Sequence, residues 1–353
     1  MNQTRTTAPS SPPGRRTNPA GEEVDAADEL PELQTITVPS FTLEDGTALG
    51  PLEQGYRVFG RIAPSKDNVV LALHSLTGDT DVTAWWPGVV GPGQVLDPDR
   101  WAVVAPNLLG SCYGTTPLVP VPEGKPAPVV TPRDQARFIA PLLDHLGVQE
   151  VALVTGGSLG GMVAMEWAAT FPQRARAAVV YAAPAAHSAQ AMGWNHLQRE
   201  AVRLGGTEGL ALARMVGMMI YRTGSEFRQR FHRNRTPQGE FQVRSYLNHH
   251  GEKLKERFDA AAYTLLLEAM DAHDVGRGRG GVCPALRAFP GVLVGVGIPG
   301  DILYPANEVK EWTREGGARY REIHALEGHD SFLTRPGQVS EILAEALKAA
   351  RSC

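Results

Sequence analysis

The run Val151-Ala-Leu-Val-Thr155 is followed directly by Gly156-Gly-Ser-Leu-Gly160. A short continuous apolar run of this kind is typical of a strand buried on both faces of a parallel sheet. Residues 159–170 have a helical pattern that ends before Pro172. The order strand, G-x-S-x-G and helix predicts a sharp turn that presents the Ser158 hydroxyl as a nucleophile at the carboxyl edge of the sheet.

Further apolar runs lie on both sides of this segment and alternate with helical patterns at 132–146 and 337–350. Strands that alternate with helices predict right-handed βαβ units, and therefore an α/β fold with a mostly parallel sheet flanked by helices. Two earlier segments alternate apolar and polar residues, as half-buried antiparallel strands do. The expected strands are 35–38, 52–58, 69–73, 101–105, 151–155, 178–181, 292–296 and 319–324.

Residues 184–290 interrupt the alternation. They are helical in period at 208–221 and 252–272 and contain no convincing strand, so we expect a helical lid inserted over the sheet. The α/β core then consists of residues 33–183 and 291–353. Residues 1–32 are rich in Pro, Ser, Thr, Gly and charge, which predicts a disordered tail.

Composition excludes several classes of protein. The chain has 353 residues with 34 basic and 38 acidic side chains, a net charge of −4, so it offers no general cationic field to nucleic acid or anionic lipid. No apolar run is long enough to span a membrane or to form a signal peptide. Cys112, Cys283 and Cys353 are scattered, which predicts neither a disulfide framework nor a metal site. We expect a cytoplasmic protein without membrane or nucleic-acid partners.

The histidine partner of Ser158 is sought after it in the chain, because this type of fold places the acid and the histidine on loops after later strands. Most of the ten histidines precede Ser158 or lie in the insertion. His329 lies in the loop between the strand at 319–324 and the final helix, where an imidazole can reach the nucleophile. His324 ends that strand and is expected to be packed or at the surface. The sequence therefore predicts His329 as the general base.

The acid of the triad is predicted to be Asp301, on the loop after the strand at 292–296. Its role is to accept the His329 N–H and to fix the tautomer of the ring. Asp274 is the alternative. Two backbone N–H groups are needed to stabilise the developing oxyanion. One is predicted to be that of Leu159, directly after the nucleophile, and the other that of Leu76, in the loop after the strand at 69–73.

Several longer segments carry a more specific signal than the G-x-S-x-G motif. They are His74-Ser-Leu-Thr-Gly-Asp79, Asn107-Leu-Leu-Gly-Ser-Cys-Tyr-Gly-Thr115, Gly156-Gly-Ser-Leu-Gly-Gly-Met-Val-Ala-Met-Glu-Trp-Ala168, Phe241-Gln-Val-Arg-Ser-Tyr-Leu247 and Gly328-His-Asp-Ser-Phe332. In these segments the chain resembles the homoserine O-acetyltransferase family of the α/β-hydrolase superfamily, and the resemblance covers roughly residues 35–348.

The resemblance implies a ping-pong acyl transfer in methionine biosynthesis. Ser158 takes acetyl from acetyl-CoA, a co-substrate and not a bound cofactor, and passes it to the side-chain hydroxyl of L-homoserine. By position, Arg222 resembles the family residue that binds the substrate carboxylate, and Asp330 resembles the residue that binds the substrate amino group. Members of this family are often homodimers through the inserted helices, so a homodimer is expected. No metal is implied.

Three segments that border the substrate pocket depart from the family pattern: the one after Pro117, the one near Gly205-Gly206 and the loop before Gly328. They leave the triad untouched. L-serine as the acceptor and succinyl-CoA as the donor therefore stay open as alternatives. An esterase-type serine hydrolase is a further alternative, since the same triad hydrolyses esters when water can enter the pocket.

Overall fold

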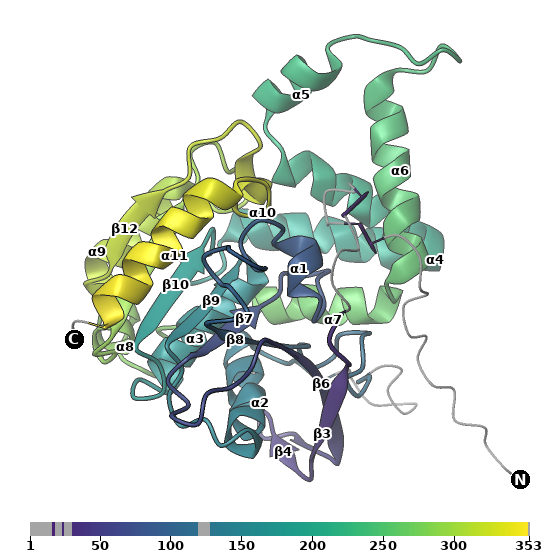
Figure 1. Ribbon diagram of the computed structural model, residues 1–353. Helices are drawn as coiled ribbons and strands as arrows, with labels where there is room; N and C mark the ends of the chain where they lie inside the picture. The colour runs from purple at the N-terminus through teal and green to yellow at the C-terminus, as the bar shows by residue number, and fades with distance from the viewer. Residues whose placement is uncertain (1–15, 18–22, 25–29, 119–127, 352–353) are drawn as a thin grey trace, which may run out of the picture.

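The computed structural model describes residues 16–17, 23–24, 30–118 and 128–351 (Figure 1). Eight strands form the central sheet: β3 (Gln34–Val38), β6 (Leu52–Phe59), β7 (Val69–Leu73), β8 (Ala102–Pro106), β9 (Leu153–Gly157), β10 (Ala177–Tyr181), β11 (Val292–Gly297) and β12 (Arg319–Glu322). Their spatial order is β12-β11-β10-β9-β7-β8-β6-β3. All neighbours pair in parallel except β6 with β8 and β3 with β6 at one edge. This confirms the mostly parallel sheet predicted from the sequence.

Two pairs of two-residue strands lie outside this sheet. β1 (Arg16–Thr17) pairs with β2 (Glu23–Val24), and β4 (Phe41–Thr42) pairs with β5 (Ala48–Leu49). Most of the tail predicted for residues 1–32 lies outside the described residues, as does much of the segment after Pro117.

Helices cover both faces of the sheet (Figure 1). On one face are α2 (Pro132–His145), α3 (Leu159–Thr170), α8 (Val282–Arg287) and α9 (Ala306–Gly316); on the other are α1 (Val82–Trp85) and α11 (Pro336–Ala350). Successive side chains of a strand point to opposite faces. Val69, Leu71 and Leu73 of β7 therefore join one hydrophobic cluster, whereas Val70 and Ala72 join the other. The inner strands β7 to β11 are buried on both sides, as their apolar runs predicted, whereas the edge strands β3 and β12 are partly exposed.

Helix α9 was not anticipated from the sequence. Its buried residues Val309, Trp312, Thr313 and Gly316 have helical spacing, and the Trp312 indole N–H donates a hydrogen bond of 3.0 Å to the Ala183 carbonyl. The helical spacing of these buried residues could have predicted the helix.

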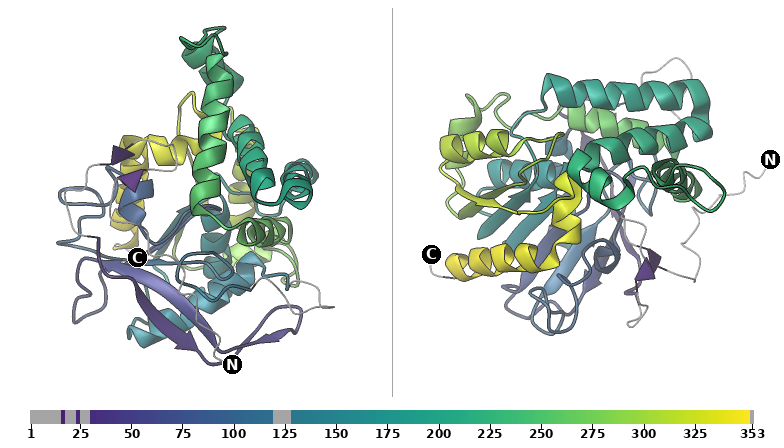
Figure 2. Two further views of the ribbon diagram at one scale, coloured as in Figure 1. Left: turned by 90° about the vertical axis from the view of Figure 1, so that its right-hand side faces the viewer. Right: turned by 90° about the horizontal axis from the view of Figure 1, so that it is seen from above.

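Five helices lie within residues 184–290. One is α8, which covers a face of the sheet, and the other four are α4 (Ala189–Tyr221), α5 (Gly224–Phe231), α6 (Gln242–Arg257) and α7 (Ala260–Asp271). α5 and the upper part of α6 project from the rest of the molecule (Figures 1 and 2). α4 is interrupted at Gly206, where φ is 54°. The helical stretch expected over 252–272 is two helices, because Phe258 is extended and the Asp259 carboxylate caps α7 by accepting the Ala262 N–H at 2.8 Å.

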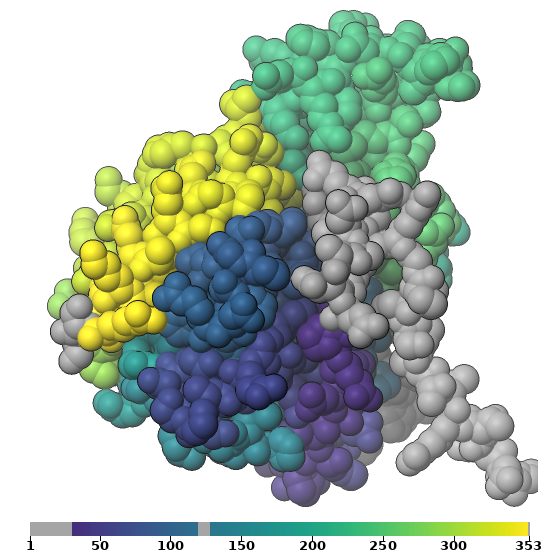
Figure 3. Space-filling view, viewed as in Figure 1, coloured from purple at the N-terminus to yellow at the C-terminus, as the bar shows by residue number. Residues whose placement is uncertain are grey.

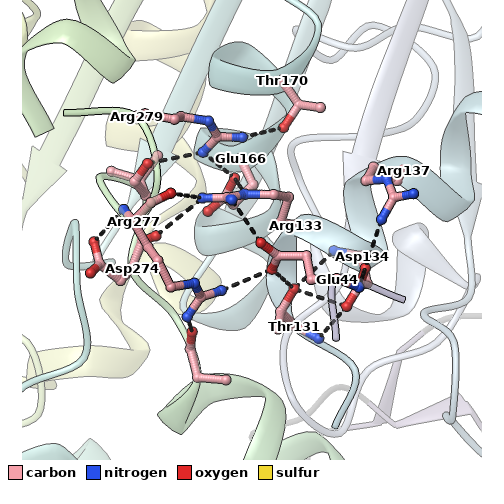
Figure 4. A network of polar contacts seen from close by, with 12 residues as sticks. Glu44, Thr131, Arg133, Asp134, Arg137, Glu166, Thr170, Asp274, Arg277 and Arg279 are labelled. Carbon is pink, nitrogen blue, oxygen red and sulfur yellow. Dashed lines mark hydrogen bonds and ion pairs between the residues drawn. The ribbon is translucent and has the colours of Figure 1, made fainter. Parts of the chain in front are cut away.

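An ionic network centred on the buried Glu166 joins the end of the lid to helices α2 and α3 (Figure 4). Glu166 of α3 is 1% exposed and contacts Arg133 of α2 at 3.2 Å and Arg279 at 2.7 Å. Glu44 contacts Arg133 at 2.7 Å and Arg277 at 2.8 Å. The pKa of Glu166 lies above its ordinary value, because burial raises it by more than the two guanidinium groups lower it. The carboxylate therefore depends on these two arginines for its charge.

No helix in the described ranges is both long and apolar enough to cross a bilayer. Cys112 and Cys283 are free thiols, and Cys353 lies outside the described residues.

Candidate active site

Ser158 stands at the turn between β9 and α3 with φ 56° and ψ −125°, a conformation that strains a residue with a Cβ atom. Neighbouring glycines allow it. A Cβ at Gly160 would lie 2.2 Å from the Leu73 carbonyl oxygen, and one at Gly157 would lie 2.3 Å from the Phe332 ring. At Gly156, the first glycine of the motif, a Cβ would lie 2.6 Å from the Gly160 carbonyl carbon. Nearby backbone atoms therefore leave no room for a side chain at Gly156 or Gly160, which explains the G-x-S-x-G pattern at this turn.

The structure brings Asp301 and His329 together. His329 Nδ1 lies 2.7 Å from Asp301 Oδ2, and both side chains are buried. The other carboxylate oxygen accepts the N–H groups of Leu303 at 2.8 Å and Tyr304 at 3.0 Å. Because the Nδ1–H is donated to the aspartate, Nε2 is the ring nitrogen available to Ser158, which lines the same cavity as His329.

The pKa of His329 follows from these neighbours. Burial lowers it, but the charge and hydrogen bond of Asp301, together with the charge of Asp330, raise it more, so that it lies above the ordinary imidazole value. A general base must be neutral. A reaction that uses His329 as its base therefore speeds up as pH rises through this raised pKa.

The two residues predicted to supply the oxyanion donors lie near the nucleophile. Leu159 is the first residue of α3, where N–H groups have no carbonyl partner within the helix. Leu76 lines the cavity on the loop after β7, and the Ser75 hydroxyl ties that loop to the turn by donating to the Gly157 carbonyl at 3.0 Å. This arrangement suits the predicted roles.

His74 holds the same loop, a role that the sequence analysis missed. Its Nδ1 lies 2.8 Å from the Ser75 carbonyl oxygen, and its Nε2 accepts the Leu108 N–H at 3.1 Å. Burial lowers the pKa of His74, so the ring is neutral. His74 was not considered as the partner of Ser158, because it precedes Ser158 in the sequence. Its place directly after a buried strand, at the carboxyl edge of the sheet, was the available signal.

Arg222 and Asp330 contact each other. Arg222 directly follows α4, and Asp330 ends the 3-10 turn η1 (Gly328–Asp330) that leads into α10 (Ser331–Thr334). Arg222 Nε lies 3.0 Å from Asp330 Oδ2, and its Nη1 lies 3.1 Å from Glu226 Oε1. Both members of the pair are buried. The two residues predicted to bind opposite ends of an amino acid therefore form a buried ion pair.

The cavity at this site is small, about 40 Å³. It is lined by Ser75, Leu76, Thr77, Gly78, Trp85, Ser158, Arg214, Tyr221, His329, Asp330, Phe332 and Leu333. Side chains must move to admit an amino acid, since this volume suits only a few water molecules. Across the part of the chain that the structure describes, no group of three or more His, Cys, Asp or Glu residues could hold a metal ion.

A family model described as alpha/beta hydrolase fold matches residues 68–204. With the sheet order and the turn at Ser158, the match identifies the protein as an enzyme of the α/β-hydrolase fold. The homoserine O-acetyltransferases of Thermobifida fusca and Thermus thermophilus are 41% and 42% identical to it, over 345 and 342 residues. These alignments cover 86% of this chain and 90% and 88% of the relatives. The chain belongs to the homoserine O-acetyltransferase family.

Two solved structures are also similar. The homoserine O-acetyltransferase of Staphylococcus aureus has a TM-score of 0.77 at 28% identity, covering 89% of this chain and 94% of that chain. Esterase E22 has a TM-score of 0.80 at 19% identity, covering 90% of this chain and 99% of that chain. At 19% identity the second likeness shows the fold alone.

Proposed function

We propose that this protein transfers acetyl from acetyl-CoA to the side-chain hydroxyl of L-homoserine through an acetyl-Ser158 intermediate. The observation that carries the proposal is its 41–42% identity with homoserine O-acetyltransferases along most of both chains. The buried Asp301–His329 pair beside Ser158 supports the acyl-enzyme, and the Arg222–Asp330 pair supports an amino-acid acceptor. The product serves methionine biosynthesis.

The mechanism has two matched halves. His329 Nε2 takes the Ser158 proton as the oxygen attacks the thioester carbonyl, and the resulting imidazolium protonates the departing CoA sulfur. In the second half His329 takes the homoserine hydroxyl proton as that oxygen attacks the acetyl-serine, then returns a proton to Ser158. The N–H groups of Leu76 and Leu159 stabilise the oxyanion in both halves.

Purified protein given acetyl-CoA or succinyl-CoA with L-homoserine or L-serine tests this proposal directly, with CoA release and the acylated amino acid as readouts. We expect O-acetylhomoserine as the main product. O-acetylserine or O-succinylhomoserine as the main product would establish one of the alternatives instead. CoA release that does not depend on any acceptor would identify a hydrolase.

The Arg222–Asp330 pair gives the acceptor site its selectivity. An amino acid has one carboxylate and one ammonium, so its carboxylate can replace Asp330 on Arg222 while its ammonium contacts Asp330. Every buried charge then keeps a partner. A molecule with only one of the two charges would leave one protein group unpaired, which is costly in a buried site.

Arg222→Ala is expected to lower kcat/KM for L-homoserine by roughly 100-fold, because a buried charge loses its partner. Ser158 acetylation by acetyl-CoA should persist, since that half-reaction involves no amino acid. The rate of acetyl transfer to a simple alcohol without a carboxylate should also be unchanged. Arg203→Ala is the matched control, because Arg203 is 63% exposed and pairs with Glu200 in its own helix. Unchanged homoserine kinetics in Arg222→Ala would refute a carboxylate-binding role.

The projecting hairpin of α5 and α6 supports acetyl-CoA as the donor (Figure 3). Between residues 228 and 244 it exposes five arginines and a single glutamate, although the whole chain is acidic. A pocket of about 390 Å³ lies there, lined by Gly224, Phe227, Arg228, Phe231, His232, Arg233 and Val243. Arginines beside aromatic rings suit the phosphates and the adenine of CoA, and the hairpin begins next to Arg222 at the acceptor site.

The double variant Arg228→Ala/Arg233→Ala is expected to raise the KM for acetyl-CoA by about tenfold or more, since a charge-assisted phosphate contact contributes about 1.5–3 kcal/mol. The KM for S-acetylpantetheine, which lacks the nucleotide, and the KM for homoserine should stay constant. Arg314→Ala, an exposed arginine on α9, is the control. Equal effects on both donors would contradict a nucleotide contact at the hairpin.

The homodimer and the cytoplasmic location expected from the sequence stay predictions. Exposed leucines on α4, namely Leu197, Leu204 and Leu212 at 53%, 75% and 52%, support the lid as the surface for such a dimer.

A further inference from the structure

The turn at residues 75–78, which carries Leu76, is held by the core at its first residue. The turn is closed by the Gly78 N–H, which donates to the Ser75 carbonyl at 2.9 Å. His74 Nδ1 lies 2.8 Å from the same carbonyl oxygen, and the Ser75 hydroxyl donates to the Gly157 carbonyl at 3.0 Å. A four-residue turn does not use the N–H of its second residue in its closing hydrogen bond. In this turn that residue is Leu76, whose N–H is the predicted oxyanion donor.

The lid holds the other half of the same turn. Arg257, the last residue of α6, donates from Nη1 to the Thr77 carbonyl at 2.8 Å, and its Nη2 lies 3.4 Å from Thr77 Oγ1. Thr77 is buried and lines the catalytic cavity beside Leu76. A hydrogen bond from a guanidinium is stronger than one between neutral groups. A charged group of the lid therefore holds the residue next to the predicted oxyanion donor.

Tyr113 orients the Arg257 side chain. Its hydroxyl donates to the Arg257 carbonyl at 2.5 Å and accepts from Arg257 Nη1 at 3.2 Å. Burial raises the pKa of Tyr113 to about 12, so the hydroxyl is protonated and can donate at neutral pH. Its ring packs edge-on against Phe258, the residue after Arg257, with centroids 5.7 Å apart. The loops after β7 and β8 therefore both meet the end of α6 at Arg257.

We propose that Arg257 is a positioning residue for acyl transfer, which holds the turn at residues 75–78 so that the Leu76 N–H points at the oxyanion. This rests on the proposed function in that Ser158 forms the acyl-enzyme and Leu76 supplies one oxyanion donor. Arg257 acts through the Thr77 carbonyl. The substrate oxygen becomes negative only as the nucleophile attacks, so the contribution of Arg257 is made in the transition state and not in substrate binding. The lid thereby completes the oxyanion hole of the core.

Acetylation of Ser158 by p-nitrophenyl acetate tests this role, because it needs the nucleophile and the oxyanion donors but neither CoA nor homoserine. In Arg257→Ala we expect the maximal rate of p-nitrophenolate release to fall about 10- to 100-fold, since a misplaced donor loses much of what one oxyanion donor contributes. The half-saturating concentration of the ester should be unchanged. Arg257→Lys keeps a cationic donor for the Thr77 carbonyl and should recover most of the rate.

A tetrahedral adduct gives a readout that a loss of stability alone would not move. 1,1,1-Trifluoroacetone forms such an adduct on a nucleophilic serine, and the oxygen of this adduct occupies the place of the oxyanion in the transition state. Its inhibition constant in Arg257→Ala should rise by the same factor by which the acetylation rate falls. Complete labelling of Ser158 with a fluorophosphonate counts the folded active sites, and this number should be the same as in the wild type.

Lys255→Ala is the matched control. Lys255 lies on the same helix and pairs within the lid, with Glu208 of α4 at 3.0 Å and with Glu252 at 2.5 Å. Its removal should change neither the acetylation rate nor the inhibition constant. Tyr113→Phe should lower the rate less than Arg257→Ala does. The double variant Arg257→Ala/Tyr113→Phe should be no slower than Arg257→Ala, because Tyr113 acts through the arginine.

An acetylation rate in Arg257→Ala within twofold of the wild type would overturn the proposal, as would a lower rate with an unchanged inhibition constant for trifluoroacetone. If Arg257→Ala does not fold, the comparison of Tyr113→Phe with Lys255→Ala decides, and equal rates in those two would overturn it. Neither measurement uses CoA or an amino acid. A wild-type protein that fails to acetylate homoserine would therefore contradict the proposed function without changing the outcome for Arg257.

Discussion

Replacing Ser158 with alanine is expected to lower acetyl transfer by roughly four to six orders of magnitude, since the reaction loses its nucleophile and the rest of the site gives only residual catalysis. The fold should persist, because the side chain lost is a single hydroxyl and glycines around the turn, such as Gly157 and Gly160, provide its shape. Initial rates of CoA release with L-homoserine measure the loss.

Mass spectrometry of the wild type given acetyl-CoA alone should show one acetyl group on Ser158, absent from Ser158→Ala. Ser225→Ala, on the exposed start of α5, is the control. A rate in Ser158→Ala within about tenfold of the wild type would refute the assignment of Ser158 as the nucleophile, because loss of a triad nucleophile lowers the rate far more than that.

Asp301→Asn and His329→Ala are each expected to cost about 10⁴-fold in kcat, and the double variant little more, because the two residues act as a unit. The 2.7 Å contact between them is the physical reason. Asp301 raises the pKa of His329, so its removal should also shift the acidic limb of the kcat–pH profile toward lower pH in Asp301→Asn.

Two control variants accompany this pair. Asp274→Asn tests the alternative acid, whose carboxylate accepts the N–H groups of Gly276 and Arg277 in a turn, and it should stay near the wild-type rate. His324→Ala tests the neighbouring histidine, which is 72% exposed. Losses that multiply in the Asp301→Asn/His329→Ala double variant, or a large loss in Asp274→Asn, would place the acid elsewhere.

The core of the fold could be predicted because its signals are local. The inner parallel strands contain apolar runs, although the parallel edge strand β12 does not, and adjacent glycines mark the turn at Ser158. The order of these elements also indicated where Asp301 and His329 would lie. Helix α9 was missed although its buried residues have helical spacing, because Pro305 was not taken as a start.

Contacts between distant segments could not be predicted in this way. Arg222 and Asp330 were assigned separate roles, yet they pair with each other at 3.0 Å, and Glu226 joins them. Thr77 and Arg257 are 180 positions apart, so no periodicity relates them. Such pairs depend on how the lid packs on the sheet, and this packing is a tertiary property of the chain.

The ion pairs around Glu166 tie one end of the lid to the α/β core. To lift this end of the lid, Arg279 must leave a carboxylate that is 1% exposed, and breaking a buried pair of this kind costs about 3–5 kcal/mol. The hairpin of α5 and α6 projects into solvent at the other end (Figure 2). We therefore expect the segment at Arg279 to stay fixed to α3 during turnover, and we expect any opening of the lid to occur on the side of the hairpin.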